Sequence, residues 1–318
     1  MLIRRERLPE EASFPHIPGS VDVTSAHVLA PAKINLYLEV LGRRPDGFHA
    51  IDTVMLAVDL FDELSVLPTA DGDIRLVCDD PALSVGPDNL VIKAAALLRQ
   101  TTGATSGATM RLTKRIPWAA GLGGGSSDAA AALAGLNDAW RTGLRDAELA
   151  VLGAQLGSDV PYFLATPAAR CTGRGEVVEP VPVGAAFDIV LAKPPMGLNT
   201  AEVYKRHAAI AAAEPYTPGD PAELLRALAA GDIEQLGRSL HNRLQRPAME
   251  LAPPVEALYR RLQQSGAAGH LMTGSGSCLF ALCRDEREAM QVAHDLLSGW
   301  PPEDELARTR VFHVRSCR

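Results

Sequence analysis

The sequence predicts a globular protein of two domains that contain both strands and helices. The chain has 318 residues, which is enough for two medium-sized domains that each bury a core. With 47% hydrophobic and 22% charged residues, its composition is that of an ordinary soluble globular protein. Segments in which apolar and polar residues alternate, typical of strands, are interspersed with Ala-rich and amphipathic segments, typical of helices.

Net charge and cysteine content restrict the possible partners. The net charge of −7 argues against nucleic acid or an anionic membrane as a partner, because such proteins need a basic surface. No apolar stretch approaches the length of a transmembrane helix, and the N-terminus lacks the apolar core of a signal peptide. Five scattered cysteines without a Cys-x-x-Cys pair indicate reduced thiols in a cytoplasmic protein and argue against a zinc site.

The first expected strand runs from His27 to Val40 and is followed by a turn with binding-site composition. The alternation along this strand places Lys33 and Asn35 on the same face. A Pro-Asp-Gly turn follows, and it presents Phe48 and His49 next to two arginines. Turns that combine an aromatic residue, histidine and arginine are more common in binding sites than in inert connections.

A glycine-rich segment from Pro117 to Asp128 carries the clearest functional pattern. Four of its twelve residues are glycine, so the backbone can adopt positive φ and nothing projects from it. We expect Ser126, Ser127 and Asp128 to cap a helix that starts in the alanines that follow. Such a loop directs several N–H groups and the positive end of a helix dipole to one point, which makes a phosphate site.

Two other interpretations of this loop are possible. The residues alone do not exclude a plain tight turn. A dinucleotide-binding fingerprint fails because Ser126 stands where its last glycine should be, and a Gly-Lys-Ser/Thr ending of a P-loop is missing. The segment Met110–Ile116 alternates, so the loop follows a strand, which is the context that an anion site requires.

The turn Gly157-Ser-Asp-Val-Pro161 places Asp159 just before an apolar segment. Asp in such a turn is most often a helix cap, so the residues alone leave a cap and a functional role equally open.

The remaining elements follow from the same patterns. Strands are expected at 51–67, 73–79, 188–192, 278–283 and 310–314, and helices at 89–101, 146–156, 201–213 and 290–298, with Thr200 as an N-cap. Residues 1–25 are charged, contain proline and lack periodicity, and we expect an extension that is flexible or packed on the surface. We place the boundary between domains 26–170 and 171–318 in a polar, Gly-rich join.

Three motifs in a fixed order carry a resemblance to a known family. They are Ala32-Lys-Ile-Asn-Leu36, the loop Gly121–Asp128, and Gly274-Ser-Gly-Ser277. This order resembles that of the GHMP kinases, which include galactose, homoserine, mevalonate and phosphomevalonate kinases. The stretches Gly42–His49, Gly157–Pro161 and Lys193-Pro-Pro are most similar to the members that phosphorylate a cytidine-diphosphate-linked methylerythritol. The resemblance extends from about residue 28 to the last strand.

The resemblance implies a fold and a chemistry. The fold class is α+β, a two-domain GHMP kinase fold with the active site in the cleft between the domains. ATP would be the phosphoryl donor, with Mg²⁺, and the acceptor a cytidine-diphosphate-linked polyol. Asp159 would be the general base and Lys33 its cationic partner, because an alcohol must lose a proton and the developing charge must be stabilised. We expect only small-molecule partners and a monomer or weak homodimer.

The resemblance also assigns binding residues. Phe48 would stack on cytosine with Tyr204 on its other face, His49 would read the base edge, and Asn35 and Thr200 would contact the substrate. No protein ligand for Mg²⁺ is assigned. The residues expected to bind the phosphates of ATP are Pro117, Gly121, Leu122, Gly123, Gly124, Gly125, Ser126, Ser127, Gly274 and Ser275.

Some positions depart from the family pattern, and two alternatives to its activity were considered. Asn242-Arg243 replaces the usual Asn-Asp, Thr166-Pro167 replaces Gly-Gly, and Phe48 replaces a tyrosine. A kinase of the mevalonate or homoserine type would not need the aromatic–histidine set. A non-catalytic binding protein with the same fold is expected to have lost the base or the lysine, and both are present here.

Overall fold

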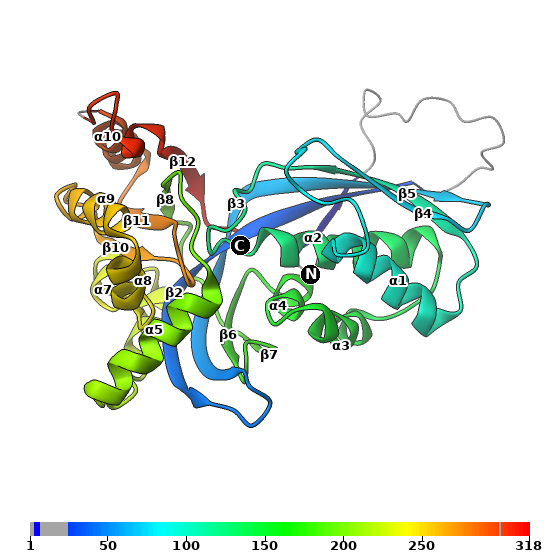
Figure 1. Cartoon of the computed structure of the whole chain (residues 1–318), viewed down its shortest axis with the longest axis horizontal. Helices are drawn as coiled ribbons and strands as arrows, with labels where there is room; N and C mark the ends of the chain where they lie inside the picture. Colours follow the sequence, from blue (N-terminus) through cyan, green and yellow to red (C-terminus); the bar gives the residue numbers. More distant parts are fainter. Residues whose placement is uncertain (1–2, 7–24, 299) are drawn as a thin grey trace. The chain divides into compact units, whose positions relative to one another are not determined.

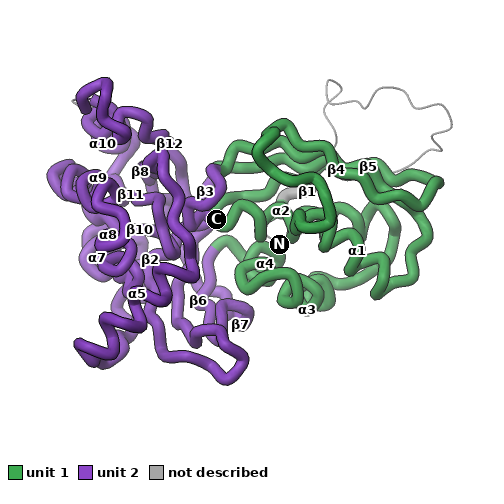
Figure 2. The backbone as a smooth tube through the Cα atoms, in the orientation of Figure 1, with its two compact units in different colours: residues 1–32, 60–116, 123–167 green, residues 33–59, 117–122, 168–318 purple. Residues whose placement is uncertain are grey.

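The computed structural model describes residues 3–6, 25–298 and 300–318 (Figure 1). The chain divides into two compact units that are built from alternating stretches of sequence (Figure 2). Unit 1 contains residues 1–32, 60–116 and 123–167, and unit 2 contains residues 33–59, 117–122 and 168–318. The boundary at 170/171 assumed contiguous domains and stays a prediction, and most of the expected extension, residues 7–24, lies outside the described residues.

Unit 1 consists of strands with helices on one face (Figure 1). The strand order is β1-β2-β3-β5-β4, in which β3 and β5 are antiparallel and β4 and β5 are parallel. Strands β2 and β3 continue into unit 2. The strands are β1 (Arg4–Glu6), β2 (Ala26–Arg43), β3 (His49–Thr69), β4 (Ile74–Cys78) and β5 (Gly107–Thr113), and the helices are α1 (Leu90–Thr102), α2 (Gly124–Ala139), α3 (Asp146–Leu156) and α4 (Val160–Ala165).

Strand β1 corrects the expectation for the N-terminal residues. Arg4–Glu6 pair antiparallel with β2, and Ile3 is buried, so these residues belong to the sheet rather than to a surface tail. Main-chain pairing requires no periodicity in the side chains, and the charged sequence therefore gave no sign of a strand.

Helix α1 follows from its sequence signals. The Asn89 side chain accepts the N–H of Val91 at 2.8 Å, and Gly103 ends the helix with a positive φ of 71°. Its buried residues recur at the spacing of one helix face, and the helix packs mainly against α2. Helix α2 differs because its residues are buried nearly all round. Gly135 is required there, since a Cβ would lie 3.1 Å from methyl groups of both Val28 and Val66.

Unit 2 contains an antiparallel sheet of four strands in the order β10-β11-β8-β12. The central strands are almost wholly buried, as their apolar sequences require. These strands are β8 (Asp188–Lys193), β10 (Gly269–Met272), β11 (Leu279–Cys283) and β12 (Arg310–Arg315). The unit also contains residues 33–43 of β2 and residues 49–59 of β3. Three short strands complete it, namely β6 (Ala168–Thr172), β7 (Val177–Pro180) and β9 (His241–Asn242).

Helices make up most of the rest of unit 2, and several of them contribute buried residues to a common apolar core. They are α5 (Thr200–Ala213), α6 (Ala222–Ala230), α7 (Ile233–Arg238), α8 (Gln245–Leu251), α9 (Pro253–Gln263), α10 (Glu286–Leu297) and the 3₁₀ turn η2 (Glu305–Arg308). The expected N-cap of α5 is wrong by one residue. Asn199 caps the helix by accepting the N–H groups of Ala201 and Glu202, which leaves the Thr200 hydroxyl available for other contacts. None of the helices in the described residues is both long and apolar enough to cross a membrane.

Candidate active site

Two predicted site residues meet on β2 within unit 2. Lys33 Nζ donates a hydrogen bond to Asn35 Oδ1 at 2.5 Å, and both side chains are buried. Asn35 Nδ2 donates to Thr53 Oγ1 at 2.8 Å, so the amide is oriented from the neighbouring strand. The expectation that Lys33 and Asn35 share a face is confirmed. The ammonium group is held in a fixed place by an uncharged partner.

Thr273 joins β2 to the first glycine loop. The N–H of Asn35 donates to Thr273 Oγ1 at 3.0 Å, and this hydroxyl lies 3.3 Å from Gly121 O. The N–H of Lys33 donates to Leu122 O at 3.0 Å. Gly121 has a φ of +77°, and a Cβ there would lie 2.2 Å from Thr273 O. Only glycine fits this position, because both the backbone angle and the neighbouring carbonyl exclude a side chain.

The second glycine-serine loop is anchored in the same part of unit 2. The hydroxyl groups of Ser275 and Thr200 are 2.8 Å apart, which links the loop to the start of α5. Asn242 Nδ2 donates to Gly274 O at 2.8 Å, and Ser277 Oγ donates to Met196 O at 2.6 Å. Residues 33–36 of the first motif, Gly121 and Leu122 of the second, and the whole third motif therefore lie in unit 2, whereas residues 123–128 of the second motif lie in unit 1.

Sequence reasoning missed three residues that support these loops. Thr273 contacts both β2 and Gly121, and Asn242 also donates to Met272 O at 2.6 Å. Lys193, which is buried, donates from Nζ to the carbonyls of Pro194 and Met196. Thr273 and Asn242 could not be assigned from sequence because their partners are far away along the chain. Lys193 was recognised only as part of the Lys193-Pro-Pro stretch, and its partners lie within three residues of it.

Phe48 lies on the surface of unit 2 rather than in a core. Its side chain is 50% exposed, and the Arg174 guanidinium lies 5.0 Å from the ring centroid. The turn that presents it is closed by a hydrogen bond from Arg44 N to Phe48 O at 2.8 Å and by the Arg44–Asp46 ion pair. Gly47 has a φ of +87°, as the predicted Pro-Asp-Gly turn requires. Phe48 is therefore not a core residue.

His49 and Tyr204 form a stacked pair. Their ring centroids are 4.6 Å apart and their planes are inclined by 22°. Partial burial, together with nearby Arg43, lowers the pKa of His49 below its ordinary value, so the imidazole is neutral at pH 7 and can both donate and accept. One face of Tyr204 is already covered by His49. A planar ligand would have to use the other face of Tyr204 or a face of Phe48.

The phosphate-binding motif continues into unit 1 as the start of α2. Gly123 is the N-cap, with a φ of +72°, and the first helical hydrogen bond runs from Ser127 N to Gly123 O. The helix thus begins before Ser126, and the expectation that Ser126, Ser127 and Asp128 cap it is wrong. Glycine reaches the required backbone angle without a side-chain cap. The N–H groups at the first positions of α2 point out of the helix end, where an anion is stabilised.

Asp159 precedes the short helix α4 in unit 1. It occupies the N-cap position of α4, but its side chain makes no capping hydrogen bond. A Cβ on Gly157 would lie 3.6 Å from Ser126 Oγ, which places this turn beside the N-terminus of α2. Asp159 belongs to unit 1 and Lys33 to unit 2.

Ser127 provides a test for the expected Mg²⁺. Its Oγ is buried and has no hydrogen-bond partner among the described residues. The same residues contain no group of three His, Cys, Asp or Glu side chains that could hold a metal ion. Mg²⁺ commonly binds through substrate phosphates and only one or two protein oxygens. The Ser127 hydroxyl, in the first turn of the helix that is predicted to bind phosphate, fits that mode.

A buried charge cluster lies beside the first turn of α2. Lys114 Nζ donates to Asp128 Oδ2 at 2.6 Å and also to Asp62, which in turn accepts the N–H groups of Arg115 and Ile116. Burial is the main cause that raises the pKa of Asp128 to about 7; Lys114 opposes this effect and Asp62 adds to it. Asp128 Oδ1 has no partner in the described part of the chain.

Replacing Asp128 by Asn should make the protein less sensitive to pH. The folded-state pKa of Asp128, about 7, exceeds the unfolded value, so the folded state keeps a proton that the unfolded state releases. Wild-type stability should therefore fall as the pH rises from about 5 to about 8. Relative to the wild type, Asp128→Asn should gain on the order of 2 kcal/mol of unfolding free energy over this range.

Urea unfolding of both proteins at the two pH values measures this difference. Asp220→Asn, which removes an exposed carboxylate from unit 2, is the control and should follow the wild-type profile. Parallel pH profiles for Asp128→Asn and the wild type would show that Asp128 does not titrate in this range.

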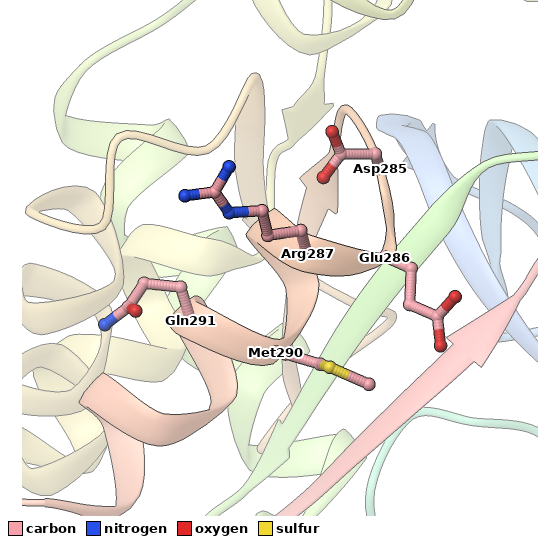
Figure 3. Close-up of a pocket in the computed structure, with 5 residues that line it drawn as sticks. All are labelled: Asp285, Glu286, Arg287, Met290 and Gln291. Atoms are coloured by element: carbon pink, nitrogen blue, oxygen red, sulfur yellow. The ribbon is translucent and has the colours of Figure 1, made fainter.

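A separate hollow of about 570 Å³ lies at the start of α10. Its lining side chains diverge and do not converge on one point (Figure 3). None of the predicted site residues belongs to it, and it is not a candidate for the active site. The lining residues are Asp285, Glu286, Arg287, Met290 and Gln291.

Comparison with known families defines the class of protein. The family model described as "GHMP kinases N terminal domain" matches residues 89–166, and that described as "GHMP kinases C terminal" matches residues 224–301. The first range contains the glycine loop with the start of α2, and also Asp159. Fold, motif order and family models together define a GHMP kinase, a small-molecule kinase that uses ATP as phosphoryl donor.

Individual relatives define the family within this class. The chain is 42% identical to the 4-diphosphocytidyl-2-C-methyl-D-erythritol kinase of Pelotomaculum thermopropionicum, over 90% of this chain and 98% of the relative. It is 44% identical to the enzyme of the same name from Symbiobacterium thermophilum, over 81% and 90%. A crystal structure of 4-(cytidine 5'-diphospho)-2C-methyl-D-erythritol kinase superposes with a TM-score of 0.74 at 33% identity, covering 91% of this chain and 98% of that one. The chain belongs to the 4-diphosphocytidyl-2-C-methyl-D-erythritol kinase family.

Proposed function

We propose that this enzyme transfers the γ-phosphoryl group of ATP to the 2-hydroxyl of 4-diphosphocytidyl-2-C-methyl-D-erythritol, a step of non-mevalonate isoprenoid synthesis. The observation that carries the acceptor assignment is the aromatic set of unit 2. The stacked pair His49–Tyr204 and the exposed ring of Phe48 provide flat surfaces for a nucleobase. The names of the relatives support the same acceptor.

Asp159 and Lys33 take the catalytic roles in this proposal. Asp159 accepts the proton of the acceptor hydroxyl, in keeping with its place in the turn 157–161 that resembles the family pattern. Lys33, held by Asn35, stabilises the negative charge that develops on the alkoxide and the transferred group. The two side chains come from different units of the chain.

The glycine motifs hold the phosphates of ATP in this proposal. The N–H groups at the start of α2 donate to phosphate oxygens, and the loop Gly274–Ser275 adds further donors. Thr200 is within hydrogen-bond reach of Ser275 and is assigned to the acceptor side. When bound, Mg²⁺ neutralises phosphate charge, and Ser127 Oγ is the protein atom assigned to it.

The setting of the reaction is proposed on the same basis. We propose that the enzyme acts in the cytoplasm, as a monomer or weak homodimer, on small molecules without nucleic-acid or membrane partners. The net charge of −7 supports the absence of nucleic-acid and anionic-membrane partners.

ADP release measured with three alcohols tests the proposed acceptor. The cytidylyl substrate should give a kcat/KM at least about 10³-fold above mevalonate and homoserine, since the loss of base stacking and phosphate contacts removes several kcal/mol. Preferred turnover of mevalonate or homoserine would assign the enzyme to that type of kinase instead. ATP binding without ADP release from any of the three would support a non-catalytic binding protein.

Replacing Phe48 by Ala should weaken binding of the acceptor and leave binding of ATP unchanged. Base–aromatic stacking is worth about 1–3 kcal/mol, so KM for the cytidylyl substrate should rise about 5- to 150-fold. KM for ATP should stay within about twofold of the wild type, and Phe48→Tyr should keep the acceptor KM because it keeps the ring. Steady-state kinetics with each substrate varied in turn measures both constants.

The control and the contrary outcomes are clear for this variant. Val77→Ala removes another exposed apolar side chain, on β4 of unit 1, and should change neither constant. A rise in the ATP constant alone would assign Phe48 to the adenine site. If KM is unchanged for both the acceptor and ATP, Phe48 has no role in substrate binding.

A further inference from the structure

A fully buried carboxylate in unit 2 has no role in the proposed chemistry. Glu39, on β2, accepts two hydrogen bonds from the Arg243 guanidinium at 2.7 Å each. It also accepts the N–H groups of Val40 and Gly219 at 3.0 Å each, and His241 Nε2 lies 3.2 Å away. Burial acts to raise the pKa of Glu39, but these hydrogen bonds, that of Arg243 foremost, hold it well below its ordinary value. The carboxylate is therefore charged at neutral pH.

The contacts of this ion pair indicate what it does. A buried ion pair contributes little net stability compared with well-packed apolar residues. We therefore expect this pair to fix the position of the segments that it joins. The Arg243 guanidinium also lies 4.0 Å from the ring centroid of Tyr216. With the bond from Gly219 to Glu39, the connection that follows α5 is held against β2 at two points.

Tyr216 connects the Glu39–Arg243 ion pair to α5. Its hydroxyl donates to Val40 O at 2.6 Å and lies 3.1 Å from His207 Nε2. Because the single hydroxyl proton goes to Val40, Nε2 must carry the histidine proton and donate it to Tyr216. Burial first, and then the nearby His49 and Arg243, lower the pKa of His207. His207 is therefore a neutral, buried anchor with one defined tautomer.

The part of α5 fixed in this way carries the stacked pair. Tyr204 precedes His207 by one helical turn on the same face, and it stacks on His49. A cavity of about 450 Å³ lies between the end of β2 and the C-terminal half of α5, and Ala211 and Tyr216 contribute to its lining. Beside this open pocket, the Tyr216 bridge provides a direct hydrogen-bonded connection between β2 and α5.

We propose that Glu39 and Arg243 are positioning residues for acceptor binding. They hold Tyr216 against β2, and Tyr216 fixes the helix that carries Tyr204. The inference rests on the proposed function in one respect, namely that Tyr204 and its partner His49 contact the acceptor base. The departure from the usual family pattern at Arg243 thereby acquires a structural reason.

Two variants remove the bridge without leaving a buried unpaired charge. Tyr216→Phe deletes only the hydroxyl. The double variant Glu39→Gln, Arg243→Met removes both members of the ion pair, whereas Arg243→Met alone would leave Glu39 uncompensated and could unfold the protein. Arg246→Met is the matched control, because Arg246 is an exposed arginine of the neighbouring α8 that pairs with Glu214.

The first measurement needs no substrate. The ring protons of His49 are shielded by the stacked Tyr204 ring, so their NMR shifts report the stacking directly. In Tyr216→Phe and in the double variant these shifts should move towards free-histidine values, and in Arg246→Met they should stay as in the wild type. Wild-type His49 shifts in a folded double variant would overturn the proposal.

The second measurement separates positioning from general destabilisation. KM for the cytidylyl acceptor should rise about 5- to 20-fold in both variants, part of the worth of a stacked base. KM for ATP and kcat should change less than about twofold. An equal rise of both KM values would overturn the proposal. Absence of wild-type turnover with this acceptor would instead refute the proposed function, and the His49 shifts would still decide whether the ion pair positions the stacked pair.

Discussion

Asp159→Asn should lower kcat by about 10²–10⁴-fold and leave the KM values for both substrates largely unchanged. Asparagine has nearly the same shape as aspartate but cannot accept the proton of the acceptor alcohol. The native side chain makes no capping hydrogen bond, so the substitution removes no support of α4. Steady-state ADP release gives kcat, and a thermal unfolding curve shows that the variant is folded.

A second aspartate at the start of a helix serves as the control. Asp285 caps α10 by accepting the N–H of Glu288 at 2.8 Å, and asparagine caps a helix about as well as aspartate does. Asp285→Asn should therefore keep wild-type kcat. Near wild-type turnover in folded Asp159→Asn would remove Asp159 from the mechanism and leave the base unidentified.

Gly121→Ala should impair both stability and ATP binding. A methyl group there would lie 2.2 Å from Thr273 O, and the backbone has a φ of +77°. The chain can accept the methyl group only by moving the loop that contains Thr273 away from β2. We expect a loss of on the order of 3 kcal/mol of unfolding free energy and at least about a tenfold weaker binding of ATP.

Gly103→Ala separates backbone strain from the collision. Gly103 has nearly the same φ, +71°, but a Cβ there meets nothing within 4 Å. Its replacement should cost only about 1 kcal/mol, the usual penalty for alanine with positive φ, and should leave ATP binding intact. Urea unfolding and calorimetric titration with ATP measure both effects. Equal results for the two variants would show that the contact of Gly121 with Thr273 has no role.

Local features of the site could be predicted from sequence because their causes are local. Alternation along β2 placed Lys33 beside Asn35, and Pro-Asp-Gly predicted the turn that exposes Phe48. The glycine loop before a helix was recognised for the same reason. Its helix nevertheless begins at Gly124, because the capping residue is a glycine in a left-handed conformation and not a serine.

Contacts between distant residues could not be predicted. Thr273 contacts Asn35 across 238 positions, and Arg243 pairs with Glu39 across 204. Neither pair leaves a periodic pattern, since each is fixed by how the strands pack and not by local propensity. The strand at Arg4–Glu6 was missed because main-chain pairing with β2 leaves no pattern in the sequence.

The burial of α2 restricts which amino-acid substitutions this enzyme can accept. From Ser127 to Asn137 every residue of the helix is buried, and most are alanine or leucine. A larger side chain at these positions has no space, and a smaller one leaves a void, so single substitutions along the helix meet a penalty in either direction. The start of this helix, which we propose to bind phosphate, is therefore difficult to alter by single substitutions. Surface turns such as that of Phe48 accept substitutions more easily, because neighbouring atoms there impose few limits on size or shape.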